Sequence, residues 1–187
     1  MAAYTVSSPS HRPRDASIAD RGKHDARVLC LGNDLLADDS LGALVAQQLR
    51  QLGWPGVEIA YSAATGFDLL DYLLDTPLLI VVDTVVTGAC APGTISVLRE
   101  DELATVPGSS PHYIGVLETL ALGRALELPL AERVTFLSVE ASDCFTVGGG
   151  IHPSVRASIP AVVKQVHDIL ALAASSGARR RPAPLGL

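Results

Sequence analysis

Short apolar runs alternate along the chain with longer segments in which apolar residues recur every three or four positions. Runs of the first kind predict buried strands, and the second spacing predicts amphipathic helices. The run LLIVVD at 78–83 is apolar up to its final acid, which is typical of a central parallel strand covered on both faces. The pattern predicts strands at 27–32, 57–61, 78–83, 94–98 and 134–139, and helices at 39–52, 66–74, 114–126 and 153–174.

This alternation of strands and helices predicts an α/β protein. We expect a three-layer sandwich with a mostly parallel central sheet of about five strands, as in phosphorylases and hydrolases. A single domain at 26–175 accounts for most of the 187 residues. Residues 1–25 and 176–187 are rich in Ser, Pro and Arg and are expected to be a flexible leader and a flexible tail.

Polar residues in three segments follow predicted strands or precede a predicted helix. Asp38 and Asp39 lie in the segment after the first strand, Asp83 ends the LLIVVD strand, and His112 lies just ahead of a helix. In a parallel sheet, functional groups gather at the carboxyl ends of the strands. Carboxylate oxygens and a neutral imidazole suit zinc or nickel, and three protein ligands leave room for an exchangeable partner. We therefore expect these side chains to meet in one exposed cleft.

Each of these residues also has a simpler interpretation. Asp39 suits the N-cap or first turn of a helix, where the helix dipole stabilises an acid. His112 suits a surface loop. Asp83 is harder to explain in this way, because an acid that ends a buried strand is costly unless it is paired or liganded. Residue pattern alone leaves these alternatives open.

Composition and missing motifs exclude several functions. The formal net charge of −6 at pH 7 does not support nucleic-acid binding, which normally uses a basic surface. The three cysteines are far apart and indicate neither a disulfide framework nor a zinc knuckle. The dinucleotide, Walker and GxSxG motifs are absent from the sequence. We expect a cytoplasmic protein without a membrane partner, because no signal peptide or membrane-spanning run is evident. We also expect a monomer.

Four segments in order resemble the nickel–iron hydrogenase maturation proteases, the endopeptidases that process the C-terminus of the hydrogenase large subunit. They are VLCLGNDLLADDSLGALVAQQL, LLIVVDTVVTGACAPGTISVL, SSPHYIGVLETLAL and GGGIHPSVRASIPAVVKQV, and together they span roughly residues 27–172. The first has the family's strand, GN-x-L-L, acid pair, glycine and helix. Because three of these blocks each contribute one proposed ligand in the same order, the match is more specific than a lone GN-x-L-L would be.

The resemblance implies an enzyme that removes a short C-terminal extension from the large-subunit precursor after nickel insertion. It assigns Asp39, Asp83 and His112 to contact nickel that the substrate carries, so no resident metal is expected. A carboxylate acts as base in the implied mechanism, with Asp39 as a catalytic residue and Asp38 as the reserve candidate. The alternatives are a nickel-sensing chaperone that does not cut, or another hydrolase or phosphorylase on a similar fold.

The sequence departs from the family pattern after the second strand. An acid and two glycines, as in DGG, are common there, whereas this chain has YSAATG at 61–66. The difference concerns backbone shape and substrate fit at that segment. It leaves the three implied ligands unchanged.

Overall fold

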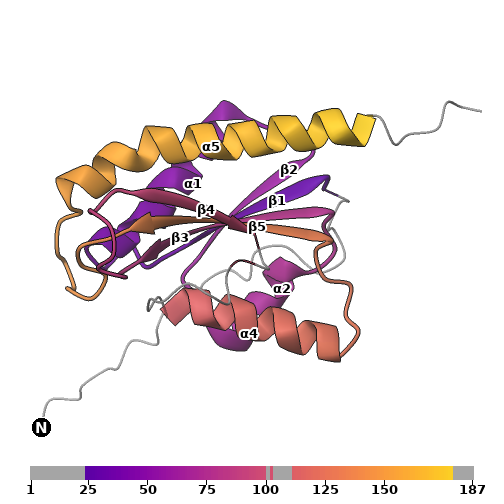
Figure 1. The fold of residues 1–187 in the computed structure, drawn as a ribbon, viewed down its shortest axis with the longest axis horizontal. Coiled ribbons are helices and arrows are strands. Elements are labelled where there is room, and N and C mark those ends of the chain that lie inside the picture. Colours follow the sequence, from indigo (N-terminus) through magenta and orange to yellow (C-terminus); the bar gives the residue numbers. More distant parts are fainter. Residues whose placement is uncertain (1–23, 100–101, 103–110, 179–187) are drawn as a thin grey trace, which may run out of the picture.

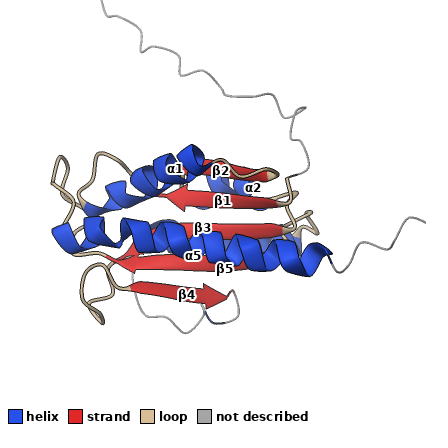
Figure 2. Ribbon diagram, turned by 90° about the horizontal axis from the view of Figure 1, so that it is seen from above, coloured by secondary structure: helices blue, strands red, loops and turns tan. Residues whose placement is uncertain are grey.

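The computed structural model describes residues 24–99, 102 and 111–178, with the side chains at 111–114 and 176–178 left outside the description. Its sheet has five strands in the order β2-β1-β3-β5-β4. Four strands are parallel, and β4 runs antiparallel to β5 at one edge. Figure 2 shows β4 pointing opposite to its neighbour β5. The strands are β1 (Ala26–Leu31), β2 (Val57–Ser62), β3 (Leu78–Val85), β4 (Ile95–Arg99) and β5 (Arg133–Glu140).

Helices cover both faces of this sheet and make the three layers expected from the sequence. Figure 1 shows α1 and α5 on one face and α2 and α4 on the other. The 3-10 helix η2 precedes α1 directly, and η3 precedes α2. The helical elements are η2 (Asp38–Ser40), α1 (Leu41–Leu52), η3 (Gly66–Leu69), α2 (Leu70–Leu73), α4 (Pro111–Ala125) and α5 (Pro153–Ala178). The predicted α/β class and mostly parallel sheet are therefore confirmed.

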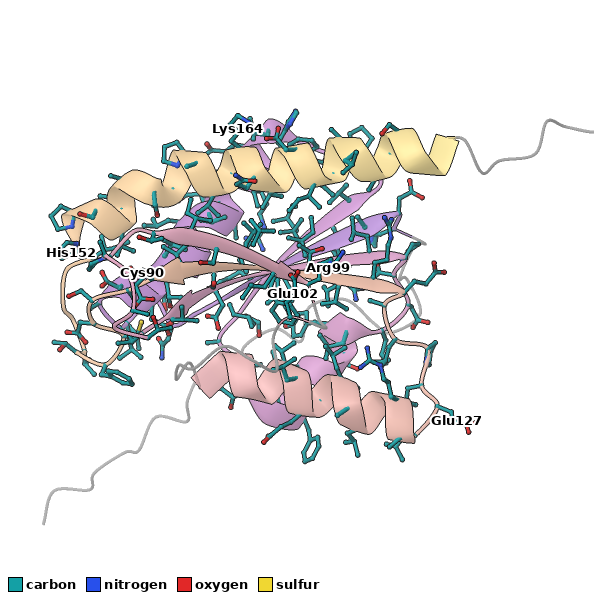
Figure 3. The ribbon with its side chains drawn as sticks, viewed as in Figure 1. Cys90, Arg99, Glu102, Glu127, His152 and Lys164 are labelled. Carbon is teal, nitrogen blue, oxygen red and sulfur yellow. The ribbon has the colours of Figure 1, made fainter. Side chains whose placement is uncertain are left out.

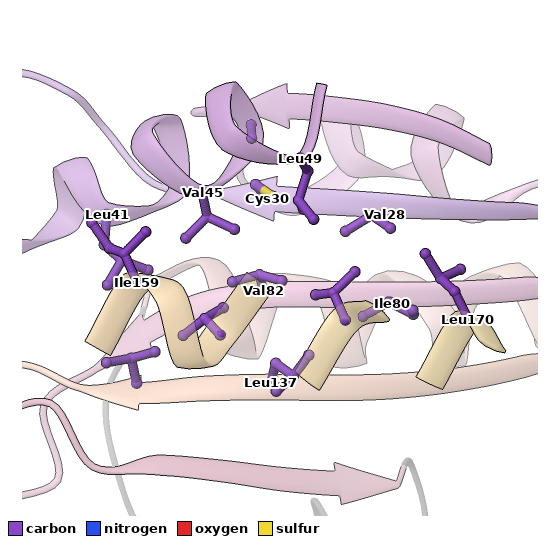
Figure 4. Packing of buried hydrophobic residues seen from close by; sticks show 14 of the residues in the cluster. Val28, Cys30, Leu41, Val45, Leu49, Ile80, Val82, Leu137, Ile159 and Leu170 are labelled. Carbon is purple, nitrogen blue, oxygen red and sulfur yellow. The ribbon is translucent and has the colours of Figure 1, made fainter. Parts of the chain in front are cut away.

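Alternate residues of each strand face opposite layers and build two cores. Val28 of β1 and Ile80 of β3 pack toward α1 and α5, where they meet residues such as Leu170 (Figure 4). Their neighbours Leu29 and Leu79 pack toward α2 and α4. Burial of one such side chain contributes about 1.5–3 kcal/mol, and both faces of β1 and β3 gain it. Because β3 is buried on both faces, its sequence is an unbroken apolar run up to Asp83.

Helix α5 is long and apolar enough to cross a membrane by length and composition. In the structure it packs along the sheet instead. Its inward residues Val155, Ile159, Val162 and Val166 recur every three or four positions and are buried against the strands. This is the packing of an amphipathic helix that lies on the sheet with one apolar face inward.

Several predicted boundaries are wrong by a few residues. Strand β3 continues past Asp83 to Val85, because Thr84 and Val85 still pair with β5. Helix α4 begins at Pro111, so the backbone of His112 lies in the first helical turn and not ahead of it. Proline suits a first helical position, since its missing N–H would have no helical partner there.

The ends of the domain also differ in part from expectation. Helix α5 extends to Ala178 with Pro160 inside it, so its last turn includes the first residues of the expected tail. Nearly all of the predicted leader and the remainder of the tail lie outside the described residues. Those two predictions stay predictions.

Candidate active site at the carboxyl ends of the strands

The adjacent acids Asp38 and Asp39 are held in the 3-10 helix that follows β1. Two glycines allow this turn to pack against the end of the strand. A Cβ on Gly32 would lie 2.1 Å from the backbone oxygen of Asp39, and φ of Gly32 is +141°. A Cβ on Gly42 would lie 1.9 Å from the backbone oxygen of Leu31. The glycines on either side of the acid pair thus fix its position by permitting close backbone contact.

Asp39 is 4% exposed, and both of its carboxylate oxygens accept hydrogen bonds. Its Oδ2 accepts from the backbone N–H of Asn33 at 2.7 Å, and its Oδ1 accepts from the hydroxyl of Thr84 at 2.8 Å. The side chain does not cap α1, whose N-cap residue is Ser40 and makes no side-chain cap. Asp39 does lie in the first turn of η2, as the simpler interpretation had it, but its carboxylate bonds to Asn33 and Thr84 and does not cap α1.

Asp83 is 1% exposed and lies within the last three residues of β3. Its Oδ1 accepts from the backbone N–H of Thr84 at 2.8 Å. Thr84 therefore contacts both acids, with its amide on Asp83 and its hydroxyl on Asp39. The sequence predicted that Asp39 and Asp83 lie at the same edge of the sheet. In the structure, Thr84 is hydrogen-bonded to both of them. That threonine was missed because a polar residue within a buried strand has no motif of its own.

Asp38 has a different environment from its neighbour. It is 1% exposed, and its Oδ2 accepts from the backbone N–H groups of Ser142 and Asp143 at 2.8 and 3.0 Å. Its Oδ1 accepts from the backbone N–H of His152 at 2.5 Å. Figure 3 labels His152 where α5 begins. Three backbone donors on one carboxylate favour a structural role for Asp38, which ties the turn after β1 to the segment between β5 and α5.

Cys144 is a second residue that sequence reasoning missed at this site. Its Sγ lies 3.5 Å from the hydroxyl oxygen of Thr84, to which it donates. Burial raises the pKa of the Cys144 thiol to about 12, the hydrogen bond with Thr84 opposes the rise, and the nearby charges of Asp39, Asp83 and Asp38 add to it. A thiol with this pKa stays protonated at neutral pH and is a poor nucleophile. The signal available in the sequence was its place just after a predicted strand.

The segment at 61–66, which departs from the family pattern, has its own local support. The Ser62 hydroxyl accepts from the backbone N–H of Ala64 at 3.1 Å, and the Ser62 carbonyl accepts from Gly32 N at 3.2 Å. The Tyr61 hydroxyl accepts from the backbone N–H of Asp34 at 3.1 Å. These contacts join the ends of β1 and β2, so hydroxyl groups organise the backbone at this edge.

The observations support only part of the predicted metal-contacting set. The side chain of His112 lies outside the described residues, so its predicted approach to the acids stays a prediction. Within the described part of the chain, no three His, Cys, Asp or Glu side chains form a group that could hold a metal ion. Asp39 and Asp83 are also buried, so they do not lie in the exposed cleft that we expected.

Solved structures resemble this fold. The hydrogenase maturating endopeptidase HybD from E. coli superposes with a TM-score of 0.67 at 28% identity, covering 81% of this chain and 93% of that one. The [NiFe] hydrogenase maturation protease HybD from Thermococcus kodakarensis gives 0.64 at 21% identity, over 77% and 97% of the two chains. The latter likeness concerns the fold alone.

Sequence comparisons then identify the family. Hydrogenase 2 maturation protease of Escherichia coli K12 is 31% identical over 144 residues, which are 74% of this chain and 86% of the relative. HoxM, a hydrogenase expression/formation protein of Azotobacter vinelandii, is 30% identical over 172 residues, or 86% and 82% of the two chains. The family model described as hydrogenase maturation protease matches residues 44–169, and the chain belongs to that family. It is a hydrogenase maturation endopeptidase, which decides against a non-cleaving chaperone or a phosphorylase.

Proposed function

We propose that this endopeptidase removes the C-terminal extension of the nickel–iron hydrogenase large-subunit precursor after nickel has been inserted. Asp39, Asp83 and His112 contact the nickel, which arrives on the substrate and is not a resident metal. The enzyme acts in the cytoplasm as a monomer. The observation that supports this best is the pair of acids, Asp39 and Asp83, which come from different segments and share Thr84 as hydrogen-bond donor.

The chemistry of this pair suits a positively charged partner. Both carboxylates are buried at the same edge of the sheet, and a divalent cation that approaches this edge would offset their negative charges. Their burial places the interaction in a medium of low dielectric, where attraction between opposite charges is stronger than in water. Because Asp39 and Asp83 are only 4% and 1% exposed, neighbouring groups must move before a metal on another protein reaches them. Substrate binding supplies that movement in our proposal.

Asp39 is the better candidate for the base. Asp39 accepts a hydrogen bond from the hydroxyl of Thr84, a donor that can rotate. Asp38 is held by three backbone N–H groups that cannot turn away. A base takes a proton from water or substrate, so a hydrogen-bond donor that can turn away suits that role better than fixed backbone groups. We therefore assign the proton transfer to Asp39 and the loop organisation to Asp38.

The proposal is tested by the mass of the product. Nickel-loaded large-subunit precursor is incubated with the purified protein, and the intact masses of the precursor and product are measured. We expect a shortened large subunit and a released C-terminal peptide whose masses add up to that of the precursor plus one water. A verified cognate precursor that keeps its full mass would contradict the proposed reaction.

A further inference from the structure

Exposed hydrophobic side chains gather at the same end of the sheet as the acids. In the part of the chain that the structure describes, four large ones lie in segments that follow the carboxyl ends of parallel strands. Single exposed hydrophobic residues are ordinary, whereas several at one place mark an interaction surface. These four, which we call the apolar rim, are Leu35 at 66% exposure, Phe67 at 72%, Phe145 at 63% and Val147 at 77%.

The two segments that carry three of these residues are joined to each other. Leu36 and Val147 form an isolated antiparallel bridge between the segment after β1 and the segment after β5. On either side of it, Gly148 N donates to Leu35 O at 2.8 Å and Ala37 N donates to Thr146 O at 3.1 Å. Backbone pairing therefore presents Leu35, Phe145 and Val147 from one assembled surface and not from separate loops.

The tip that carries Phe145 is itself fixed. The carboxylate of Asp143 accepts from the backbone N–H groups of Phe145 and Thr146 at 2.8 and 3.0 Å. The backbone N–H of Asp143 is in turn held by Asp38. A side chain presented on a preformed turn loses less conformational freedom on binding than one on a mobile loop. The exposed phenyl ring is thus prepared for a partner before that partner arrives.

Phe67 extends the rim toward α4. It lies in η3, where the carbonyl of Gly66 accepts from the hydroxyl of Thr119 at 2.9 Å. A Cβ on Gly115 of α4 would lie 2.8 Å from the backbone nitrogen of Gly66, so η3 and α4 are in close contact near the start of that helix. Phe67 thus follows β2 at the same end of the sheet as the other rim residues and lies beside α4.

The apolar rim lies beside Asp39, and this position indicates which partner binds to it. Asp38 and Asp39 directly follow Ala37, which pairs with the Phe145 segment. A protein whose metal contacts Asp39 must cover this pair of segments. The half-buried carboxylate of Asp143 borders the same surface, so a partner with a basic group beside an apolar centre is complementary to it.

We propose that the apolar rim is the docking surface for the hydrogenase large-subunit precursor, which binds it with an apolar surface that has a basic group beside it. This inference rests on the proposed function for the identity of the partner. It adds the residues that bind the precursor outside the metal-contacting acids. Apolar contact at the rim provides affinity, and the acids then report whether nickel is present.

The test compares rim variants with a matched residue at the opposite end of the molecule. Leu35→Ser and the double variant Phe145→Ser/Val147→Ser remove rim side chains. Leu126→Ser is the control, since Leu126 is a 57% exposed leucine next to Glu127, which Figure 3 shows at the end of the molecule away from His152. All these side chains are largely exposed, so the urea midpoints should match that of the wild type.

Binding is measured by biolayer interferometry with the nickel-loaded precursor immobilised and each variant placed in an Asp39→Asn background that prevents cleavage. We expect Kd to rise about tenfold for the double variant and severalfold for Leu35→Ser, with Leu126→Ser unchanged. Equal Kd values for rim and control variants would overturn the docking surface, even if the wild type cuts the precursor. A rim effect on binding would support it, even if no cleavage occurred. Loss of self-association in the rim variants with unchanged precursor binding would show that a second copy occupies the rim and would also overturn it.

Discussion

Replacement of Asp39 by asparagine is expected to slow processing of the nickel-loaded precursor at least about a hundredfold, the range lost with a general base. The change removes the negative charge and the basic oxygen while keeping the shape of the side chain. The amide oxygen can still accept from Asn33 N, and the amide nitrogen can donate to the hydroxyl oxygen of Thr84. The variant should therefore fold normally. Processing is followed by the initial rate of product formation in gel or mass measurements.

Asp34→Asn is the matched control for this prediction. It removes the same charge from the same segment between β1 and α1, but Asp34 is exposed, and the hydrogen bond to Tyr61 comes from its backbone N–H. We expect a change in rate of less than about threefold, since an exposed charge is screened by water. Equal rates for the Asp39→Asn and Asp34→Asn proteins would remove Asp39 from the active site.

Asp38→Ala is expected to destabilise the whole domain. The substitution leaves three backbone N–H groups, at Ser142, Asp143 and His152, without their carboxylate acceptor. Hydrogen bonds to a charged group contribute about 1.5–3 kcal/mol each, so the loss of three is expected to cost several kcal/mol. That is a large part of the free energy of unfolding of a typical domain, about 5–15 kcal/mol. The loss is measured as a lower urea midpoint with an unchanged m-value.

The contrast with Asp143→Ala separates this effect from ordinary surface loss. Asp143 also accepts two backbone N–H groups, from Phe145 and Thr146, but it is only half-buried, so water can reach its carboxylate. Water replaces it, so we expect a much smaller shift of the urea midpoint. If the Asp38→Ala protein unfolds at the same urea concentration as the Asp143→Ala protein, the structural role is wrong and the catalytic role of Asp38 regains support.

Much of the fold was predictable because buried positions are apolar and recur with the period of the strand or helix that carries them. The run LLIVVD predicted a strand buried on both faces, and β3 lies in the centre of the sheet between β1 and β5. The start of α4 was placed three residues late at 114, because the residues at 111–113 do not show the apolar spacing of the helix that Pro111 begins. Such boundaries depend on terminal contacts, which the apolar spacing does not record.

The candidate site was predictable only in part. Parallel topology brings Asp39 and Asp83 to the same edge, which the sequence rule for strand ends anticipates. The rule does not distinguish Asp39 from Asp38, because the difference lies in which backbone groups each carboxylate meets. Those partners include Ser142 and His152, more than a hundred residues away along the chain. Thr84 and Cys144 were not predicted for the same reason. Their place in the site depends on contacts between distant segments at the sheet edge.

The most direct test of the central claim compares two forms of one substrate. Large-subunit precursor is prepared with nickel and without it, nickel content is verified by metal analysis, and the initial rates of cleavage by the wild-type protein are measured side by side. If the buried acids act on nickel carried by the substrate, the nickel-loaded form is cut at least about a hundredfold faster, as expected when a metal ion supplies the charge at the reacting site. Equal rates for the two forms would contradict the account.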